Sequence, residues 1–289
     1  MIPANQDQHK IPQVYLKKFG YINSNNQWKI SVKSGDEKFI RQKSIESFTA
    51  VTNIFDIESD DLNIPRMFEQ LNCNLETEYN NILSELENNG KLNDKSYAYL
   101  LQITANLIAR SDYWREAILE MLQYENKENF LEAILGHHSK DNEEFQKIRE
   151  QPFFRKLADS PPFEVINHTL LYFISYLMLR LWHYEIVFIQ SPNERPWFTS
   201  TNPVIVHNRM EPMEIFNKDS EIYFPLSPNY LAYFHFRDSE DKENHLRAYE
   251  SNKIYPATED EYSSLQNIII ENPSDLLIIA GEFKYSNIP

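Results

Sequence analysis

The sequence predicts an α+β fold in a single domain spanning residues 1–289, and three observations support this prediction. Long runs with apolar residues at steps of three and four occupy the middle of the chain, about residues 64–183. Short runs rich in β-branched and aromatic residues follow over about 184–289, and a hairpin pattern precedes the middle. Because helices and strands are segregated along the chain, we do not expect a doubly wound parallel sheet. The C-terminal sheet is expected to be mostly antiparallel or mixed, with a late helix.

The N-terminal segment is predicted to hold a short helix followed by a β-hairpin. Pro12 suits the first helical position, and Gly20 suits a left-handed residue just past the last turn. Residues 28–32 alternate apolar and polar, residues 34–36 supply a turn, and residues 38–42 continue in an extended pattern. These signals place the hairpin ahead of the helical middle.

The periodic runs and the turn signals between them give the remaining elements in order. Helices are predicted over residues 64–89 (closed by Gly90), 94–123, 127–135, 143–157, 163–182 and 259–271. Strands are predicted over residues 185–190, 197–200, 203–207, 221–224, 230–236 and 276–283. The charged stretch over residues 237–247 is expected to be a solvated loop.

Composition disfavours several classes of protein. The net charge of −15 disfavours loose binding to a polyanion. Only 5 glycines are present, and no run resembles a phosphate-cradling or dinucleotide-binding loop. The single cysteine, Cys73, excludes an internal disulfide and is expected to be a small buried thiol. The sequence shows no secretory signal, and the apolar core of the 163–182 helix is too short to span a bilayer, so we expect a cytoplasmic protein without a membrane partner.

Polar residues accompany the apolar face of the helix that begins at residue 64. At about 100° per residue, Glu69, Asn72 and Glu76 fall along one edge of that face. A partly buried carboxylate there requires a cation, a metal or a hydrogen-bond donor. A divalent metal such as magnesium or manganese is therefore a candidate cofactor. The alternative is an ordinary helix flank with solvated glutamates.

The next predicted helix carries a polar stripe that includes Asn106 and Arg110. Polar groups on an otherwise apolar helix must be satisfied inside the protein. The planar guanidinium of Arg110 suits a carboxylate or phosphate. It would either pair with Glu69 or Glu76 as a structural ion pair or bind an anionic substrate beside them. Arg115 lies on another side of the same helix and is expected to be exposed.

Two further segments carry candidate functional residues. His9 precedes a proline-initiated turn that contains Tyr15, and its near-neutral pKa suits a general base, although a capping role is the alternative. Ser200 and Asn202 stand just before Pro203 at the end of a predicted strand, where they either form a turn or line a pocket. No Gly-x-Ser-x-Gly elbow surrounds Ser200, so a serine hydrolase is not predicted.

Four motifs occur in an order that resembles a known family: His9-x-x-Pro12-x-x-Tyr15-Leu16-x-x-Phe19, the Arg110 to Arg115 pair, Thr199-Ser200-x-Asn202-Pro203-Val204 and Pro225-Leu226-Ser227-Pro228. Together they resemble the bacterial family catalogued as domain of unknown function 4238, over nearly the whole chain. The resemblance implies no established activity. Because some relatives are associated with defence against bacteriophage, it implies that role as a hypothesis. Thr201 stands where the family's usual pattern has aspartate, so a role of that acid would be altered here.

Two functions remain open at this point. The first is a hydrolase-like effector acting on nucleic acid or a nucleotide. It assigns catalysis to His9, Glu69, Glu76 and Arg110. It assigns substrate binding to Tyr15, Asn106, Ser200 and Asn202. The second is a non-catalytic sensor of a phage or cellular component, with the polar residues serving as structure. Partners would be a small molecule, a nucleic acid or a phage protein, and a homo-oligomer is compatible with both.

Overall fold

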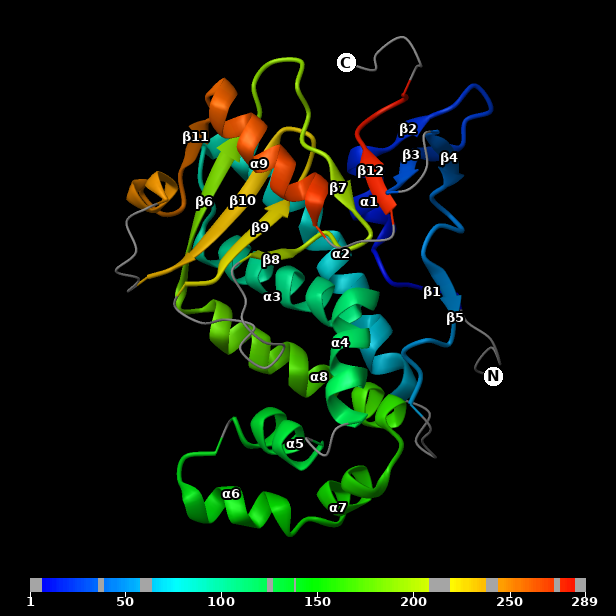
Figure 1. Ribbon diagram of the computed structural model, residues 1–289, viewed down its shortest axis with the longest axis vertical. Coiled ribbons are helices and arrows are strands. Elements are labelled where there is room, and N and C mark those ends of the chain that lie inside the picture. Colours follow the sequence, from blue (N-terminus) through cyan, green and yellow to red (C-terminus); the bar gives the residue numbers. More distant parts are fainter. Residues whose placement is uncertain are drawn as a thin grey trace.

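The computed structural model describes residues 7–35, 39–57, 64–123, 127–137, 139–207, 219–237, 244–272 and 276–283, except for the side chains of residues 64–67, 69 and 70. Strands come first, helices follow, and strands with a late helix complete the chain, as predicted (Figure 1). The helices are α1 (Gln13–Phe19), α2 (Ile64–Asn89), α3 (Asp94–Arg110), α4 (Asp112–Gln123), α5 (Lys127–Gly136), α6 (Asn142–Arg149), α7 (Pro152–Asp159), α8 (Pro162–Leu181) and α9 (Glu259–Glu271). A short 3-10 helix covers His245–Ala248.

The strands are β1 (Asp7–His9), β2 (Tyr21–Ile22), β3 (Trp28–Ser34), β4 (Arg41–Ser44), β5 (Ala50–Thr52), β6 (Tyr184–Gln190), β7 (Thr199–Ser200), β8 (Ile205–His207), β9 (Glu221–Pro225), β10 (Tyr230–Phe236), β11 (Ile254–Pro256) and β12 (Leu276–Ile279). Within the described residues, one five-stranded sheet has the order β11-β6-β10-β9-β8, and β1 pairs with β5. The β11–β6 pair is parallel and the other pairs of that sheet are antiparallel, so the C-terminal sheet is mixed.

A second five-stranded sheet joins the two ends of the described chain. Strand β12 lies between β3 and β7 and is antiparallel to both, with Ile278 opposite Val32 and Thr199 (Figure 1). The predicted hairpin of β3 and β4 belongs to this sheet. Through β12, strand β7, which precedes Pro203, joins the same sheet as β3, and α1 packs against β3.

Two local predictions about α1 are wrong. Pro12 is the N-cap, with φ −57° and ψ 137°, rather than the first helical residue. Gly20 has φ −87° and ψ −177°, an extended conformation rather than a left-handed one. Glycine is required there by a close approach, because an added Cβ would lie 2.7 Å from the carbonyl oxygen of Lys29 and 2.8 Å from Cδ1 of Ile45.

Two predicted helices are each divided in the structure. At Ser111 the backbone is extended, with φ −68° and ψ 143°, and the Ser111 hydroxyl accepts a hydrogen bond from the Trp114 N–H at 3.4 Å. A serine that caps the next turn competes with a continuous helix, so α3 ends and α4 begins there. The segment predicted over 143–157 is likewise two helices, because Pro152 starts α7 and cannot continue a preceding helical hydrogen-bond pattern.

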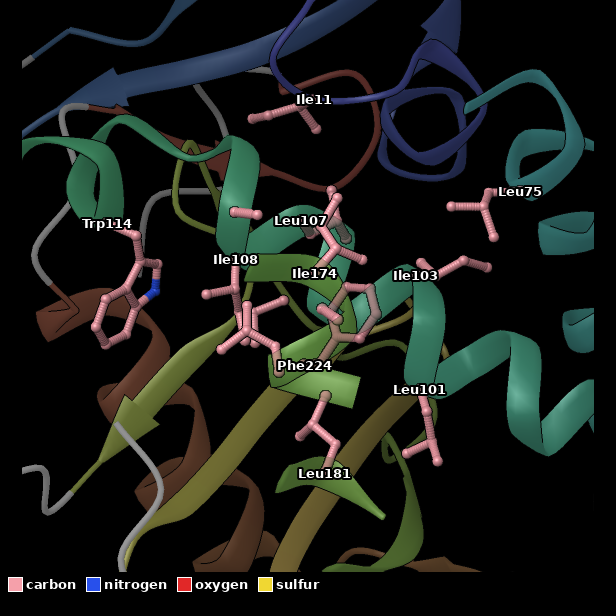
Figure 2. Close-up of a cluster of buried hydrophobic side chains, with 14 of the residues drawn as sticks. Ile11, Leu75, Leu101, Ile103, Leu107, Ile108, Trp114, Ile174, Leu181 and Phe224 are labelled. Atoms are coloured by element: carbon pink, nitrogen blue, oxygen red, sulfur yellow. The ribbon is translucent and has the colours of Figure 1, made fainter. Parts of the chain in front are cut away.

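Helix α3 lies between α2 and α8 and supplies much of the core. Figure 2 shows Ile103, Leu107 and Ile108 of α3 among neighbours that include Ile174 of α8 and Phe224 of β9. The other face of the mixed sheet is covered by α9, whose Leu265 and Ile269 pack in a second cluster (Figure 1). Because apolar burial is the main favourable term in folding, these two clusters fix where the polar side chains of α2 and α3 lie.

Three residues lie in surroundings that differ from the prediction. Cys73 is exposed, because its neighbour Asn72 takes the inward position on α2. Arg115 is half-buried: it donates to Asn167 Oδ1 at 2.8 Å, and its Cζ is 5.4 Å from the ring centroid of Phe55. Arg247, expected in a solvated loop, has a side chain that is only 6% exposed. The packing of α4 against α8 explains the position of Arg115, and the fold of the 3-10 helix explains that of Arg247. Neither contact can be predicted from the neighbouring sequence. In the described part of the chain, no helix combines the length and apolarity needed to cross a bilayer.

Candidate functional site

A narrow pocket lies where the α1 segment meets α2 and α3. It is lined by Pro12, Val14, Tyr15, Asn72, Leu75, Glu76, Tyr79, Ile103, Asn106, Leu107 and Arg110. Leu75 of α2 and Ile103 and Leu107 of α3 form the apolar side of the pocket, and Figure 2 shows Leu75 opposite the other two. The space between the lining atoms is about 310 Å³ with the open mouth included, at the lower end of the range for ligand pockets. Its interior has room for little more than a water-sized group.

Three polar side chains of this pocket form a directional chain of hydrogen bonds. Arg110 Nη1 donates to Asn106 Oδ1 at 3.2 Å, and Asn106 Nδ2 donates to Asn72 Oδ1 at 3.1 Å. A guanidinium can only donate, so Arg110 fixes which end of the Asn106 amide faces it. Asn106 then fixes the Asn72 amide in the same way. This series of hydrogen bonds ends at Asn72 Nδ2, which has no hydrogen-bond partner in the described part of the structure although Asn72 is only 3% exposed.

Arg110 also ties the pocket to the N-terminal strand. Its Nη2 donates to the backbone carbonyl of His9. Its Cζ lies 5.4 Å from the ring centroid of Phe55 and 5.8 Å from that of Phe68, a range in which cation–π attraction operates. Asn106 and Arg110 of the predicted α3 polar stripe therefore both have hydrogen-bond partners inside the protein. The side chain of Glu69, the other carboxylate that we expected beside Arg110, lies outside the described residues.

The imidazole of His9 does not line the pocket. Its Nε2 is 3.1 Å from Gln13 Nε2 and 3.0 Å from the carbonyl oxygen of Glu46. His9 therefore reaches Arg110 through its backbone, and its ring contacts the segment between β4 and β5. This position fits the structural alternative better than that of a general base beside Arg110.

Tyr15 and Tyr79 line the pocket with their rings and connect it to the strands through their hydroxyl groups. The Tyr15 hydroxyl shares a 2.5 Å hydrogen bond with Thr199 Oγ1 and donates to the Pro225 carbonyl at 2.9 Å. The Tyr79 hydroxyl donates to the Leu226 carbonyl. Burial raises the pKa of both phenols far above the ordinary value, so both stay neutral. Their hydroxyl groups are engaged in holding α1 and α2 against β7 and β9.

Ser200 and Asn202 form a separate cluster at the end of β7. Ser200 Oγ donates to the Asn202 carbonyl at 2.9 Å and accepts from the Asn202 N–H at 3.1 Å, while Asn272 Nδ2 donates to the same carbonyl at 3.0 Å. The Thr201 hydroxyl accepts from the Leu276 N–H at 3.2 Å, which joins this turn to β12. Neither Ser200 nor Asn202 lines the pocket, so of the predicted site residues the structure brings together Tyr15, Glu76, Asn106 and Arg110.

The donor groups of the described side chains bear on the metal hypothesis. Among these side chains, no group of three or more His, Cys, Asp and Glu residues lies close enough together to hold a metal ion. Glu76 is the carboxylate that the described residues contribute to the pocket. A magnesium or manganese ion here would have to draw most of its ligands from amide oxygens, water or the substrate.

A second polar cluster, which the sequence analysis missed, surrounds Glu221 at the start of β9, a strand that lies between β8 and β10 in the mixed sheet. Its carboxylate accepts hydrogen bonds from Tyr223 (2.6 Å), Tyr233 (2.6 Å), Asn244 (2.8 Å) and Arg247 Nε (3.0 Å). Burial raises the pKa of Glu221, but these four donors outweigh burial and hold that pKa below its ordinary value. The available signal was a glutamate at the start of an otherwise apolar and aromatic strand, where a buried charge requires a partner.

The fold and the site define a class: an α+β protein with a small pocket between helices, in which an arginine organises two amide side chains. The family described as protein of unknown function (DUF4238) matches residues 7–280. The chain belongs to this family, which confirms the resemblance carried by its ordered motifs. Comparisons with curated proteins and with solved structures gave no significant match.

Proposed function

We propose that this protein binds one small polar ligand in the pocket between α1, α2 and α3, as a cytoplasmic sensor of a cellular or phage-derived component. The observation that supports this is Asn72, whose Nδ2 is buried at the pocket without a hydrogen-bond partner among the described residues. An unsatisfied buried donor costs about 1–3 kcal/mol. A ligand acceptor would remove that cost. A few placed polar groups on apolar walls are typical of small-ligand sites.

The positions of the candidate catalytic residues favour binding over hydrolysis. The His9 ring contacts Gln13 and Glu46 rather than the pocket, and Arg110 holds Asn106 and the His9 carbonyl. Hydrolysis of a nucleotide or nucleic acid is the second candidate function. It is supported by Glu76, a carboxylate that lines the same pocket as Arg110 and would orient a water molecule.

Filling the pocket tests the binding proposal. Val14 is a partly buried wall residue, so Val14→Trp should occupy the space between the helices. Val51→Trp makes the same change at an exposed position of β5 and serves as the control. Nucleosides, nucleoside triphosphates, ribose 5-phosphate and inorganic phosphate are titrated into each protein by calorimetry. We expect at least one probe to bind wild type and Val51→Trp but not Val14→Trp; binding that Val14→Trp retains would refute the proposal.

Turnover separates the two candidate functions. Wild type, His9→Ala and Glu76→Gln are incubated with nucleoside triphosphates, RNA and DNA in the presence of magnesium or manganese, and phosphate release and strand cleavage are followed. A sensor gives the same background rate in all three proteins. Metal-dependent turnover in wild type that falls at least tenfold in Glu76→Gln would instead establish the hydrolase.

The antiviral role has its own test in cells. Bacteria that express wild type, Val14→Trp or Val51→Trp are challenged with a panel of bacteriophages, and plaque counts are compared at matched protein levels. If the pocket serves defence, wild type and Val51→Trp lower the plaque count and Val14→Trp does not. Equal protection by all three proteins would separate defence from the pocket.

A further inference from the structure

We propose that one end of the mixed sheet is an acid-opened latch, in which uptake of a proton by His235 releases the 3-10 helix from the sheet. The inference concerns residues that do not line the pocket, and it does not depend on the proposed function. It follows from the place of His235 in a row of charged and titratable side chains. It also follows from its Nε2 atom, which is buried without a hydrogen-bond partner among the described residues.

Two histidines and two glutamates form a row across four neighbouring strands. His207 of β8 is opposite Glu221 of β9. His235 of β10 is opposite Glu221 on one side and opposite Glu185 of β6 on the other (Figure 1). Directly opposed residues of antiparallel strands point to the same face of a sheet, so all four side chains lie on one face. His235 therefore lies between two carboxylates.

The 3-10 helix packs on the face that carries His235. Arg247 Nε donates to Glu221 Oε1 at 3.0 Å, and Asn244 donates to the same oxygen at 2.8 Å. Asn244 also donates to the Tyr233 hydroxyl at 3.2 Å. The Tyr233 ring stacks on the ring of His235, with centroids 5.6 Å apart and an interplanar angle of 26°. The contacts that hold the 3-10 helix are thus next to the His235 ring.

The position of His235 suits a neutral imidazole. Its side chain is only 5% exposed, and its Nδ1 is 3.4 Å from the Phe236 carbonyl oxygen. Because a carbonyl oxygen only accepts, Nδ1 carries the hydrogen of the neutral ring, and Nε2 is the atom that takes up a proton. Nε2 lies 3.9 Å from Oε2 of Glu185, which is beyond hydrogen-bond distance. In the closed latch a new N–H on Nε2 would therefore have no acceptor among the described residues.

The charges around His235 do not compensate a proton on its ring. Glu221 already accepts four hydrogen bonds, and Glu185 Oε1 also lies 3.8 Å from Arg237 Nε. Burial is the largest influence and lowers the pKa of His235 below its ordinary value of 6.5. Arg247 acts in the same direction, whereas the two glutamates act in the opposite one. A protonated ring is therefore favoured in a locally opened state, where water surrounds it.

Acid favours the open latch because the open state binds the proton more tightly. Well above pH 6.5 the His235 ring is neutral in both states, so pH does not change their balance. Below that value the opening constant rises by up to about tenfold per pH unit, until the pH reaches the pKa of the closed state. The pKa of Glu221 lies below 4.5, so this carboxylate stays ionised at pH 5. The range from pH 7.5 to pH 5 therefore reports on His235 rather than on Glu221.

Hydrogen exchange followed by mass spectrometry tests the latch on the full-length protein. Protection factors, corrected for intrinsic exchange rates, are measured from pH 7.5 to pH 5 for peptides that cover residues 244–249 and for peptides of α3. The N–H groups of Arg247 and Tyr249 are hydrogen-bonded within the first segment and report its opening. In wild type we expect protection of residues 244–249 to fall at least about threefold across this range, while α3 keeps its protection.

Three variants connect the opening to His235. His235→Gln keeps a polar neutral side chain but cannot titrate, so protection of residues 244–249 should not vary with pH. His207→Gln makes the same change at the exposed end of the row and should keep the wild-type profile. Glu185→Gln leaves the ring in place and removes a charge that raises its pKa, so the fall in protection should be at least as large as in wild type. Circular dichroism melting at pH 7.5 verifies folding.

Several results would overturn the latch. Wild-type protection that stays constant, or an equal fall in folded His235→Gln, would remove His235 as the titrating group. Protection that increases in acid would show that Glu185 turns to bind the charged ring and closes the segment. An equal loss of protection in α3 would indicate destabilisation of the whole fold. If His235→Gln does not fold, a smaller fall in Glu185→Gln than in wild type would contradict the inference.

Discussion

Two arginines of this protein whose side chains are almost fully shielded from water belong to hydrogen-bond networks of opposite character. Arg247 donates to Glu221, a carboxylate that also accepts from two tyrosines and an asparagine. The network around Arg110 runs through two amides to a donor that lines a pocket. The first network is centred on a charge inside the protein, whereas the second ends at a buried amide of a residue that lines the pocket.

The difference indicates how burial of a polar group relates to function. A carboxylate that accepts four hydrogen bonds has little capacity left for an incoming molecule, so the Glu221 network is suited to holding the 3-10 helix against the mixed sheet. A series of amides that ends in an unsatisfied donor is stabilised when a ligand supplies an acceptor to that donor. A buried charge alone therefore does not identify a functional site. An unsatisfied donor or acceptor at the end of its hydrogen-bond network is the better indicator.

The largest expected effect comes from breaking the Glu221 network. Glu221→Gln removes the charge that faces Arg247, whose side chain is only 6% exposed, which should lower the free energy of unfolding by about 3–5 kcal/mol. Urea denaturation measures it. Glu143→Gln removes a carboxylate from an exposed pair with Lys147 and should leave the urea midpoint essentially unchanged. Equal midpoints for the two variants would show that the Glu221 network does not stabilise the fold.

A smaller loss is expected from Arg110→Met. Methionine keeps apolar volume near Phe55 and Phe68 but removes the donors to Asn106 and to the His9 carbonyl. Two buried neutral acceptors lose their donors, which should cost about 2 kcal/mol in the same urea assay. A loss as large as that of Glu221→Gln would mean that the two networks play equivalent structural roles.

Acid should weaken one network and not the other. The folded pKa of Glu221 lies below the ordinary value of 4.5, so its carboxylate contributes stability that is fully present above that value and is lost as the pH falls through the folded pKa. Urea midpoints measured from pH 6 to pH 3 should therefore decline more steeply for wild type than for Glu221→Gln. Asn106→Leu alters only amides of the pocket and should keep the wild-type slope; a flattened slope in that variant would contradict the comparison.

The smallest effect on stability is expected at Asn72. Asn72→Leu removes a buried donor that has no partner in the described structure, and it deprives Asn106 Nδ2 of its acceptor, so one unsatisfied donor replaces another. The free energy of unfolding should change by less than about 1 kcal/mol. Asn244→Leu, which removes a donor to Glu221, should cost more than Asn72→Leu. The reverse order would assign the structural role to the pocket network.

The parts of the site that lie on one helix were predictable from sequence. A period of 3.6 residues placed Asn72 and Glu76 on one edge of α2 and Asn106 with Arg110 on one face of α3, and the pocket contains all four. The aromatic and β-branched runs likewise gave β6, β9 and β10 close to their observed bounds. Local periodicity was sufficient wherever the contact partners belonged to the same element.

The remainder depended on contacts between distant segments. Nothing near Arg247 in the sequence indicates that it meets Glu221, because that ion pair forms only when the 3-10 helix folds over the sheet. The Ser111 break depended on competition between a side-chain hydroxyl and the helical backbone, which the surrounding apolar pattern masked. The hydrolase hypothesis put the His9 ring beside Arg110, but the guanidinium meets the His9 backbone carbonyl, a position that the β1–β5 pairing sets.

The position of β12 determines when this chain can complete its fold during synthesis. Strand β3 is made early, yet the neighbour that covers one of its edges emerges only with residues 276–279. Until then the backbone groups on that edge are unpaired, and so is the partner side of β7. The ribosome must therefore release the chain through residue 279 before the sheet that contains β3, β12 and β7 closes. A nascent chain stalled upstream of residue 276 would expose an unpaired strand edge to chaperones and to its own copies.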